Sequence, residues 1–160
     1  MTFFRSPPVR VVQQNSWWCW AACLEMLNTS QPAMFGTSRR NQSQWVDAML
    51  SAPVASSALN AYQGLNMRFF PQFTNALGMQ YRVWIPARQE PPDLAFVELK
   101  LRCSLLLTVI TTPGGNAHFV IITGVDGRYV HYTDPAPGPA LKIVPYALVV
   151  QQPLAIAWKP

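Results

Sequence analysis

The sequence predicts an α+β fold, with helices in the first half of the chain and an antiparallel sheet in the second half. Apolar residues recur at helical spacing in the first half, whereas the second half holds short runs rich in β-branched and aromatic residues. Turn signals separate those runs, and Asp126-Gly127 in particular favours a two-residue hairpin. Because hairpins join antiparallel neighbours, we expect the strands to form an antiparallel meander.

The first expected helix begins at Cys19, has Ser16 as its expected N-cap and ends in the polar stretch 29–32. One buried stripe runs along it, formed by Cys19, Ala22, Cys23, Met26 and Leu27. A second helix follows Ser43 and stops at Pro53. Further helical segments are expected at Ser56–Tyr62, Pro71–Leu77 and Pro92–Arg102.

Strands are expected where β-branched and aromatic residues cluster between turn signals. They cover Met79–Ile85, Ser104–Thr112, His118–Val125, Tyr129–Asp134, Leu141–Val144 and Leu154–Trp158. A turn at Pro113–Asn116 and a proline-rich loop at 135–139 connect some of them. Neither a repeat nor a linker interrupts the chain, so we expect one domain over residues 1–160.

Composition limits the classes of function. Half of the residues are hydrophobic and 12% are charged, which excludes an intrinsically disordered chain. The net charge of +5 comes from scattered basic residues, so we expect no nucleic-acid partner. No apolar run approaches the roughly 20 residues of a membrane span, and the first residues lack the apolar core of a Sec signal peptide. We therefore expect a protein that is cytoplasmic, or delivered into a target cell by a dedicated secretion system.

The three cysteines do not form a closed disulfide set. Cys19 and Cys23 lie one helical turn apart, where their sulfurs point along the helix rather than toward each other, and Cys103 precedes an expected core strand. Reduced thiols and a reducing compartment fit this arrangement. With two histidines and no Cys-x-x-Cys pair, the chain offers few zinc ligands, so we expect neither a metal nor another cofactor.

Four residues have the chemistry and the placement needed for a cysteine nucleophile. Cys19 opens a helix, whose N–H groups and dipole favour the thiolate, and His118 heads an apolar strand from which its ring can reach the sulfur. Asp134 ends another strand and would orient the His118 ring. Gln13, six residues before Cys19, would donate its amide to the oxyanion together with the Cys19 N–H.

This pattern resembles the papain-like cysteine peptidases. The resemblance rests on Gln13, on the Cys19-Trp20-Ala21 run that opens a helix, and on His118 before an apolar strand. The intervals of six residues from glutamine to cysteine and sixteen from histidine to acid are similar to the family's. The run Trp-Cys-Trp-Ala-Ala looks more like the compact bacterial branches, which include bacteriocin-leader peptidases and effector peptidases injected by plant pathogens. The resemblance implies an N-terminal helical lobe packed on a C-terminal sheet lobe, with the site in the cleft between them.

The sequence departs from papain at three points. Trp17-Trp18 stands where papain has Gly-Ser in its Cys-Gly-Ser-Cys run, so the nearby disulfide is missing. Asp134 replaces papain's asparagine, which suits the bacterial branches. About one hundred residues separate Cys19 from His118, against roughly 130–150 between papain's cysteine and its later partners, so papain's substrate subsites do not carry over.

Other cysteines and another histidine could fill the roles of nucleophile and base. Taken alone, Cys19 reads as a buried core residue, as Cys23 and Cys103 do. Its position after two tryptophans at a helix start, with a glutamine upstream, favours the nucleophile instead. His131 competes with His118, but its position within a strand and close to the acid suits a surface residue better than a base.

The acid and the substrate-binding residues also have simpler explanations. Asp126 competes with Asp134 but is fully explained as a hairpin residue, and Asp134 before a proline is itself common turn chemistry. Gln13 and Gln14 are adjacent, and either could be an ordinary polar residue. The interval of six residues to Cys19 favours Gln13 as the oxyanion donor. Trp18 and Gly115 are the expected substrate-binding residues, although the first is also a packing residue and the second a turn residue.

The leading hypothesis is a small cysteine peptidase that hydrolyses peptide bonds through an acyl-thioester and acts as a delivered bacterial effector or toxin. Its partners would be a protein or peptide substrate and a cognate immunity protein, and we expect a monomer that binds no membrane. Two alternatives stay open. The same triad serves amidases, deamidases and acyl transferases, and the same fold also suits a catalytically silent binding module.

Overall fold

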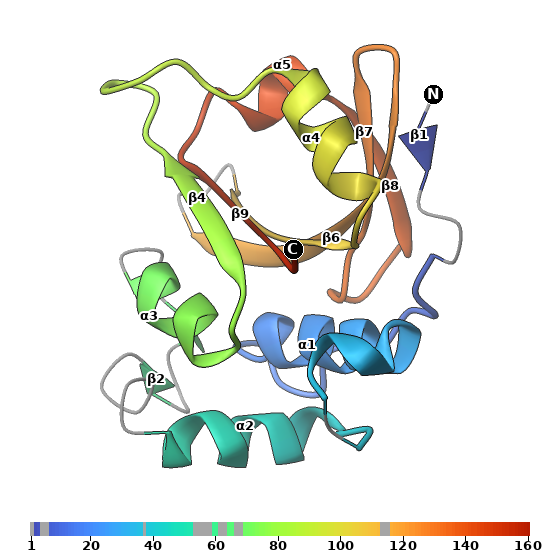
Figure 1. Ribbon diagram of the computed structural model, residues 1–160, viewed down its shortest axis with the longest axis vertical. Coiled ribbons are helices and arrows are strands. Elements are labelled where there is room, and N and C mark those ends of the chain that lie inside the picture. The colour runs from blue at the N-terminus through green and yellow to red at the C-terminus, as the bar shows by residue number, and fades with distance from the viewer. Residues whose placement is uncertain are drawn as a thin grey trace.

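The computed structural model describes residues 2–3, 7–36, 38–52, 59–60, 64–65, 69–112 and 116–160. The first half of the chain forms a layer of helices and the second half forms a curved antiparallel sheet (Figure 1). The expectation of an α+β fold is therefore confirmed. Within the ranges described, none of the helices has both the length and the apolar character that a membrane span requires.

The helical layer is built around α1 (Cys19–Ser30). Next to it lie η1 (Pro32–Met34), α2 (Gln42–Ser51), α3 (Phe70–Ala76) and the paired strands β2 (Leu59–Asn60) and β3 (Gly64–Leu65). Nearly every residue of α1 as far as Asn28 is buried, because α2 and the sheet both pack against this helix. This burial fixes the position of Cys19 at the start of α1.

Seven strands form the sheet among the described residues, in the order β4-β9-β5-β6-β7-β8, with β1 paired to β6 off that path. Their bounds are β1 (Thr2–Phe3), β4 (Gln80–Trp84), β5 (Leu106–Thr111), β6 (Ala117–Asp126), β7 (Tyr129–Thr133), β8 (Leu141–Pro145) and β9 (Leu154–Trp158). Every pairing between them is antiparallel. Two helices, α4 (Leu94–Leu101) and α5 (Tyr146–Val149), lie on the face of the sheet opposite α1.

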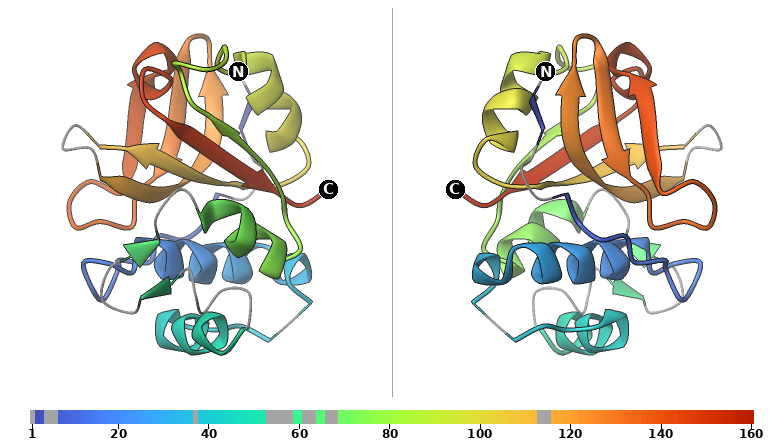
Figure 2. Two further views of the ribbon diagram at one scale, coloured as in Figure 1. Left: turned by 90° about the vertical axis from the view of Figure 1, so that its left-hand side faces the viewer. Right: turned by 90° about the vertical axis from the view of Figure 1, so that its right-hand side faces the viewer.

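The sheet separates two hydrophobic cores, and β6 contributes to both. Phe119 and Ile121 pack in the core shared with α1, whereas Val120 and Ile122 pack in the core shared with α4. Figure 2 shows the helical layer on one side of the sheet and α4 on the other. Successive side chains of a strand alternate between its faces, which explains why this run is apolar without interruption. The strand that carries His118 is thus packed on both faces.

α1 begins at Cys19 as expected, but its N-cap differs from the expectation. Trp18, not Ser16, is its N-cap, and no described side chain caps the first turn. The expected Ser16 cap is wrong because the backbone turns at residues 14–17, where the Trp18 N–H donates to the Asn15 carbonyl at 3.0 Å. The helix consequently begins two residues later than a Ser16 cap requires.

The second and third expected helices also need correction. α2 begins at Gln42, because Asn41 and Gln44 form a capping box in which each side chain accepts the other's backbone N–H. The helix expected at Ser56–Tyr62 is wrong where the chain is described, since Leu59–Asn60 pairs as β2. The rest of that segment lies outside the described residues.

The other expected strands and helices agree with the structure. Each expected strand is present, with bounds within two residues of those expected, and α3 and α4 lie at the helices expected from apolar spacing. The short elements β1, η1 and α5 were not expected, because two to four residues carry too little periodicity to detect. Most of the turn expected at Pro113–Asn116 lies outside the described residues.

We expect Phe119→Ala to lower the free energy of unfolding by about 3–5 kcal/mol, because it empties a fully packed site. Phe119 is 1% exposed, and its ring lies 6.0 Å from that of Phe70 and 5.7 Å from that of Phe73. Leu99→Ala is the matched control, since Leu99 is 56% exposed and its loss should cost no more than about 0.5 kcal/mol. Urea unfolding measures both, and equal losses would contradict the assignment of Phe119 to the core.

Candidate active site

Asp134 follows β7 directly and is almost fully buried, with 4% of its side chain exposed. A buried carboxylate is costly unless its oxygens are paired, and both oxygens are paired here. Oδ1 lies 2.7 Å from His118 Nε2 and accepts a 2.8 Å hydrogen bond from the Ala136 N–H. Oδ2 lies 2.7 Å from Lys142 Nζ, which β8 carries. The carboxylate is thus held at both ends.

The register of the sheet brings His118 to this carboxylate. Thr133, at the end of β7, pairs with Ile121 in β6, so Asp134 lies beside the start of β6, where His118 stands. His118 faces Asp134 through Nε2, which leaves Nδ1 for another partner. Cys19 lies close enough to the same ring to raise the pKa of the imidazole.

Cys19 is the first residue of α1 and is buried in the core that α1 shares with the sheet. α1 packs against β6, so the thiol from the helical layer and the imidazole from the sheet meet where the two layers join. The N–H groups of the first helical turn are not used by any described side-chain cap. They and the helix dipole favour negative charge at this end of the helix.

His118 and Asp134 each stabilise the charged form of the other. Burial lowers the pKa of His118, but the hydrogen bond with Asp134 and the nearby Cys19 raise it, and the result is a pKa of about 9. Burial also raises the pKa of Asp134, but hydrogen bonds from His118, Lys142 and the Ala136 N–H bring it well below its usual range. At neutral pH the pair is therefore an imidazolium and a carboxylate.

Gln13 lies in the extended segment that leads to α1. Its backbone N–H donates to the Pro135 carbonyl at 2.9 Å, which ties this segment to the loop after Asp134. Its side-chain Nε2 donates to the Asn15 carbonyl at 3.1 Å, and the same carbonyl accepts from the Trp18 N–H. An amide nitrogen carries two hydrogens, so the contact with Asn15 leaves one N–H able to donate elsewhere.

Of the two expected substrate-binding residues, Trp18 and Gly115, the structure describes only Trp18. Trp18 is half-buried and packs against the core that contains Cys19, and its Nε1 atom is buried with no partner among the described residues. Gly115 lies outside the described residues.

The rival residues lie away from this cluster or deeper in the core. Cys23 is fully buried, and burial raises the pKa of its thiol. Cys103 follows α4, on the opposite face of the sheet, and is exposed, so the expectation that it is a buried core residue is wrong. His131 lies in the middle of β7, and Asp126 ends β6 at the opposite end from His118. In the described part of the chain, no group of three or more His, Cys, Asp or Glu side chains could hold a metal ion.

Comparison with known families places this cluster in context. The model of the family described as papain-like cysteine protease AvrRpt2 matches residues 5–147, a range that contains Cys19, His118 and Asp134. The chain belongs to this family. It is therefore a cysteine peptidase of papain-like fold, as the sequence resemblance implied. No curated protein is similar enough in sequence to count as a match.

Three solved structures share the fold of this peptidase. The peptidase domain of Streptococcus ComA, a bifunctional ABC transporter involved in quorum sensing, has a TM-score of 0.58 at 15% identity, covering 94% of this chain and 98% of that one. A double glycine motif protease from an AMS/PCAT transporter, solved with its leader peptide, has a TM-score of 0.54 at 15% identity, with 99% and 95% covered. A C39-like peptidase from Bacillus anthracis has a TM-score of 0.55 at 11% identity, with 98% and 97% covered.

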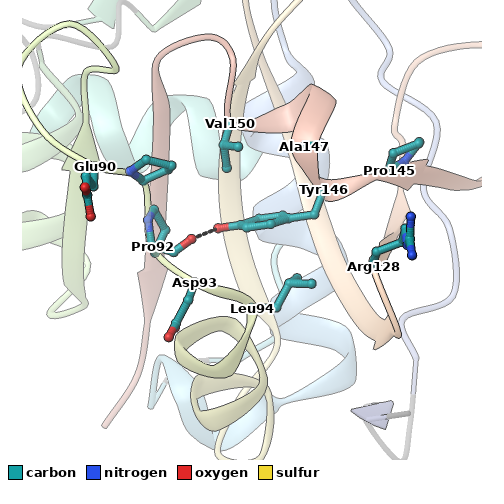
Figure 3. A pocket seen from close by; sticks show the side chains of 10 residues that line it. Glu90, Pro92, Asp93, Leu94, Arg128, Pro145, Tyr146, Ala147 and Val150 are labelled. Carbon is teal, nitrogen blue, oxygen red and sulfur yellow. Dashed lines mark hydrogen bonds between the residues drawn. The ribbon is translucent and has the colours of Figure 1, made fainter.

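A pocket of about 640 Å³ lies elsewhere in the peptidase, on the side of the sheet covered by α4 and α5 (Figure 3). Its lining includes Leu94 at the start of α4, Arg128 in the β6–β7 turn and Tyr146 in α5, whose hydroxyl donates to the Pro92 carbonyl at 2.6 Å. Cys19, His118 and Asp134 do not line it, so the pocket is separate from the candidate site.

Three residues that contact Asp134, the loop after it or the segment around Gln13 were not expected from the sequence: Arg10, Gln42 and Lys142. Arg10 Nε donates to the Asp134 carbonyl at 2.9 Å, and Arg10 Nη2 donates to the Ala136 carbonyl. Lys142 offered one signal, because it is the charged residue in the otherwise apolar run of β8. Nothing in the sequence near Arg10 or Gln42 distinguishes them from ordinary polar residues.

We expect His118 to titrate with a midpoint near 9, and to titrate at a lower pH in Asp134→Asn, because that change removes the paired charge. NMR of the histidine ring nitrogens measures both midpoints, and His131→Asn assigns the second histidine. Because the folded-state pKa is raised, the stability that this proton contributes is complete below about pH 6.5 and is lost as the pH rises through 9. A midpoint that Asp134→Asn leaves unchanged would contradict the coupling.

Proposed function

We propose that this peptidase hydrolyses peptide bonds through an acyl-thioester on Cys19. The observation that carries the proposal is the gathering of three groups: Asp134 lies 2.7 Å from the His118 ring, and Cys19 lies near enough to that ring to raise its pKa. With a pKa of about 9, His118 is mostly protonated at neutral pH, and the nearby thiol is the natural source of that proton. The reactive form is then an ion pair of the Cys19 thiolate and the His118 imidazolium.

In the first half of the reaction, the thiolate attacks the carbonyl carbon of the scissile bond, and the carbonyl electrons move onto oxygen. The Cys19 backbone N–H and the free N–H of the Gln13 amide stabilise this oxyanion. As the carbon–nitrogen bond breaks, His118 gives its Nδ1 proton to the leaving amine, and the acyl group remains on sulfur. Asp134 keeps the His118 ring oriented and stabilises its charged form.

In the second half, water replaces the amine. Neutral His118 takes a proton from the water as the water oxygen attacks the thioester carbonyl. The tetrahedral intermediate collapses, the carbon–sulfur bond breaks, and the carboxylic acid leaves. The Cys19 thiolate and the His118 imidazolium are restored.

A peptide is the substrate that we propose. It is supported by the double glycine motif protease that shares the fold and was solved with a leader peptide. We assign Trp18, half-buried beside Cys19, and Gly115 to the substrate-binding surface. An amidase, a deamidase or an acyl transferase would use the same catalytic residues, and the mass of the reacted substrate separates these outcomes: new termini mean proteolysis.

We expect Cys19→Ala to abolish cleavage of a peptide library, with a loss in kcat/KM of at least about 10³-fold, while Cys103→Ala stays close to wild type. Mass spectrometry of the products measures both. In wild type, iodoacetamide should label Cys19 well below pH 7, and His118→Ala should remove that advantage. Equal labelling rates in the two proteins would favour a catalytically silent binding module.

As its biological role, we propose a monomeric bacterial effector or toxin that is delivered into another cell and restrained in the producing cell by an immunity protein. The three cysteines are free, which fits a reducing target compartment. Expression inside candidate target cells tests the role. We expect wild type to arrest growth and Cys19→Ala to be harmless, with equal soluble amounts checked by immunoblot. Unimpaired growth with active wild type would contradict the role and leave the chemistry intact.

A further inference from the structure

Gln42, the first residue of α2, is a fully buried polar side chain that holds the segment before α1. Its Oε1 accepts the Gln14 N–H at 2.8 Å, and its Nε2 donates to the Val12 carbonyl at 2.9 Å. The side-chain amide thus pairs with a donor and an acceptor of the same segment, as a neighbouring strand would. The residue between these two attachment points is Gln13.

The same segment is held from its other side by the loop that follows Asp134. The Gln13 N–H donates to the Pro135 carbonyl at 2.9 Å, and Arg10 donates to the carbonyls on either side of Pro135. Three successive carbonyls of this loop therefore accept hydrogen bonds from the segment. Because Gln42 and this loop bind opposite sides of it, the backbone at Gln13 is fixed between α2 and the catalytic acid.

We propose that Gln42 is a positioning residue for the oxyanion donor Gln13. The inference rests on the proposed function, in which the Gln13 amide stabilises the oxyanion. Such a donor acts only when it is held within about 0.5 Å of its working position, so its backbone support matters as much as the amide itself. A buried amide is also costly unless both of its groups are paired, and Gln42 pairs both within this one segment.

A double-mutant cycle between Gln42→Met and Gln13→Ala tests the proposal. Methionine keeps the length of the side chain and lacks both amide hydrogen bonds. With a peptide that wild type cleaves, we expect Gln42→Met to lower kcat by about 10- to 100-fold with little change in KM, since misplacement by about 1 Å costs that much. In the Gln13→Ala background, Gln42→Met should lower kcat by no more than about twofold further, because the donor that it positions is gone.

Asn28→Leu is the matched control in both backgrounds. Asn28 is equally buried, and its Oδ1 accepts the Arg40 N–H at 2.8 Å, away from the Gln13 segment. Its effect on kcat should be the same with and without Gln13. The rate of Cys19 alkylation by iodoacetamide supplies a second readout. Alkylation develops no oxyanion, so Gln42→Met should leave this rate within about twofold of wild type, whereas a general disturbance of the site would lower it.

The outcomes separate this inference from the proposed function. Equal losses from Gln42→Met in the wild-type and Gln13→Ala backgrounds would overturn the positioning role. A Gln13→Ala variant with wild-type kcat would show that Gln13 is not the oxyanion donor, and would overturn both that part of the proposed function and this inference. If Gln42→Met does not fold, Gln42→Glu takes its place in the cycle, since it keeps an acceptor for the Gln14 N–H and loses the donor to Val12. The same dependence on Gln13 is then expected.

Discussion

The contact between His118 and Asp134 is the interaction on which the rest of the site depends. Asp134 is buried, so its charge has to be balanced within the protein, and the groups that balance it come from β6, from β8 and from the loop between β7 and β8. The sheet must therefore be assembled before this carboxylate can exist as an anion at a tolerable cost. The anion in turn keeps His118 charged and turned toward Cys19. Burial, which alone would neutralise both groups, instead strengthens their pairing, because water cannot compete for either.

The two cores supply the rigidity that this arrangement needs. β6 is packed on both faces, so His118 at its start has a fixed backbone, and α1 is buried along most of its length, which fixes Cys19. The solved peptidases that share this fold have 11–15% identity with the chain. Many different apolar side chains can fill the two cores, so the layered arrangement is common to these proteins although most residues differ.

The sequence indicated the residues of the candidate site that local chemistry specifies, and missed those that distant contacts specify. Cys19 at a helix start, His118 at a strand start and Asp134 at a strand end were each visible in a short window of residues, as were all the longer strands. The Ser16 cap was wrong because a hydrogen bond between backbone groups shaped the turn before α1. Lys142, Gln42 and Arg10 were missed because their partners are chosen by the sheet register and the helix packing, neither of which a short window contains.

The hydrogen bond between Arg10 and the Asp134 carbonyl joins positions 124 apart in the chain, so the site is closed by some of the longest-range contacts in the molecule. Contacts of such high sequence separation are late to form, because a long loop must be closed before they contribute anything. On the ribosome, the thiol and its helix emerge well before the imidazole, and the carboxylate emerges after both. A chain that is still being synthesised, or that is cut short before residue 134, therefore carries the sulfur without the complete cluster of Cys19, His118 and Asp134. The topology itself delays completion of the cluster until the strands that carry His118 and Asp134 have been synthesised.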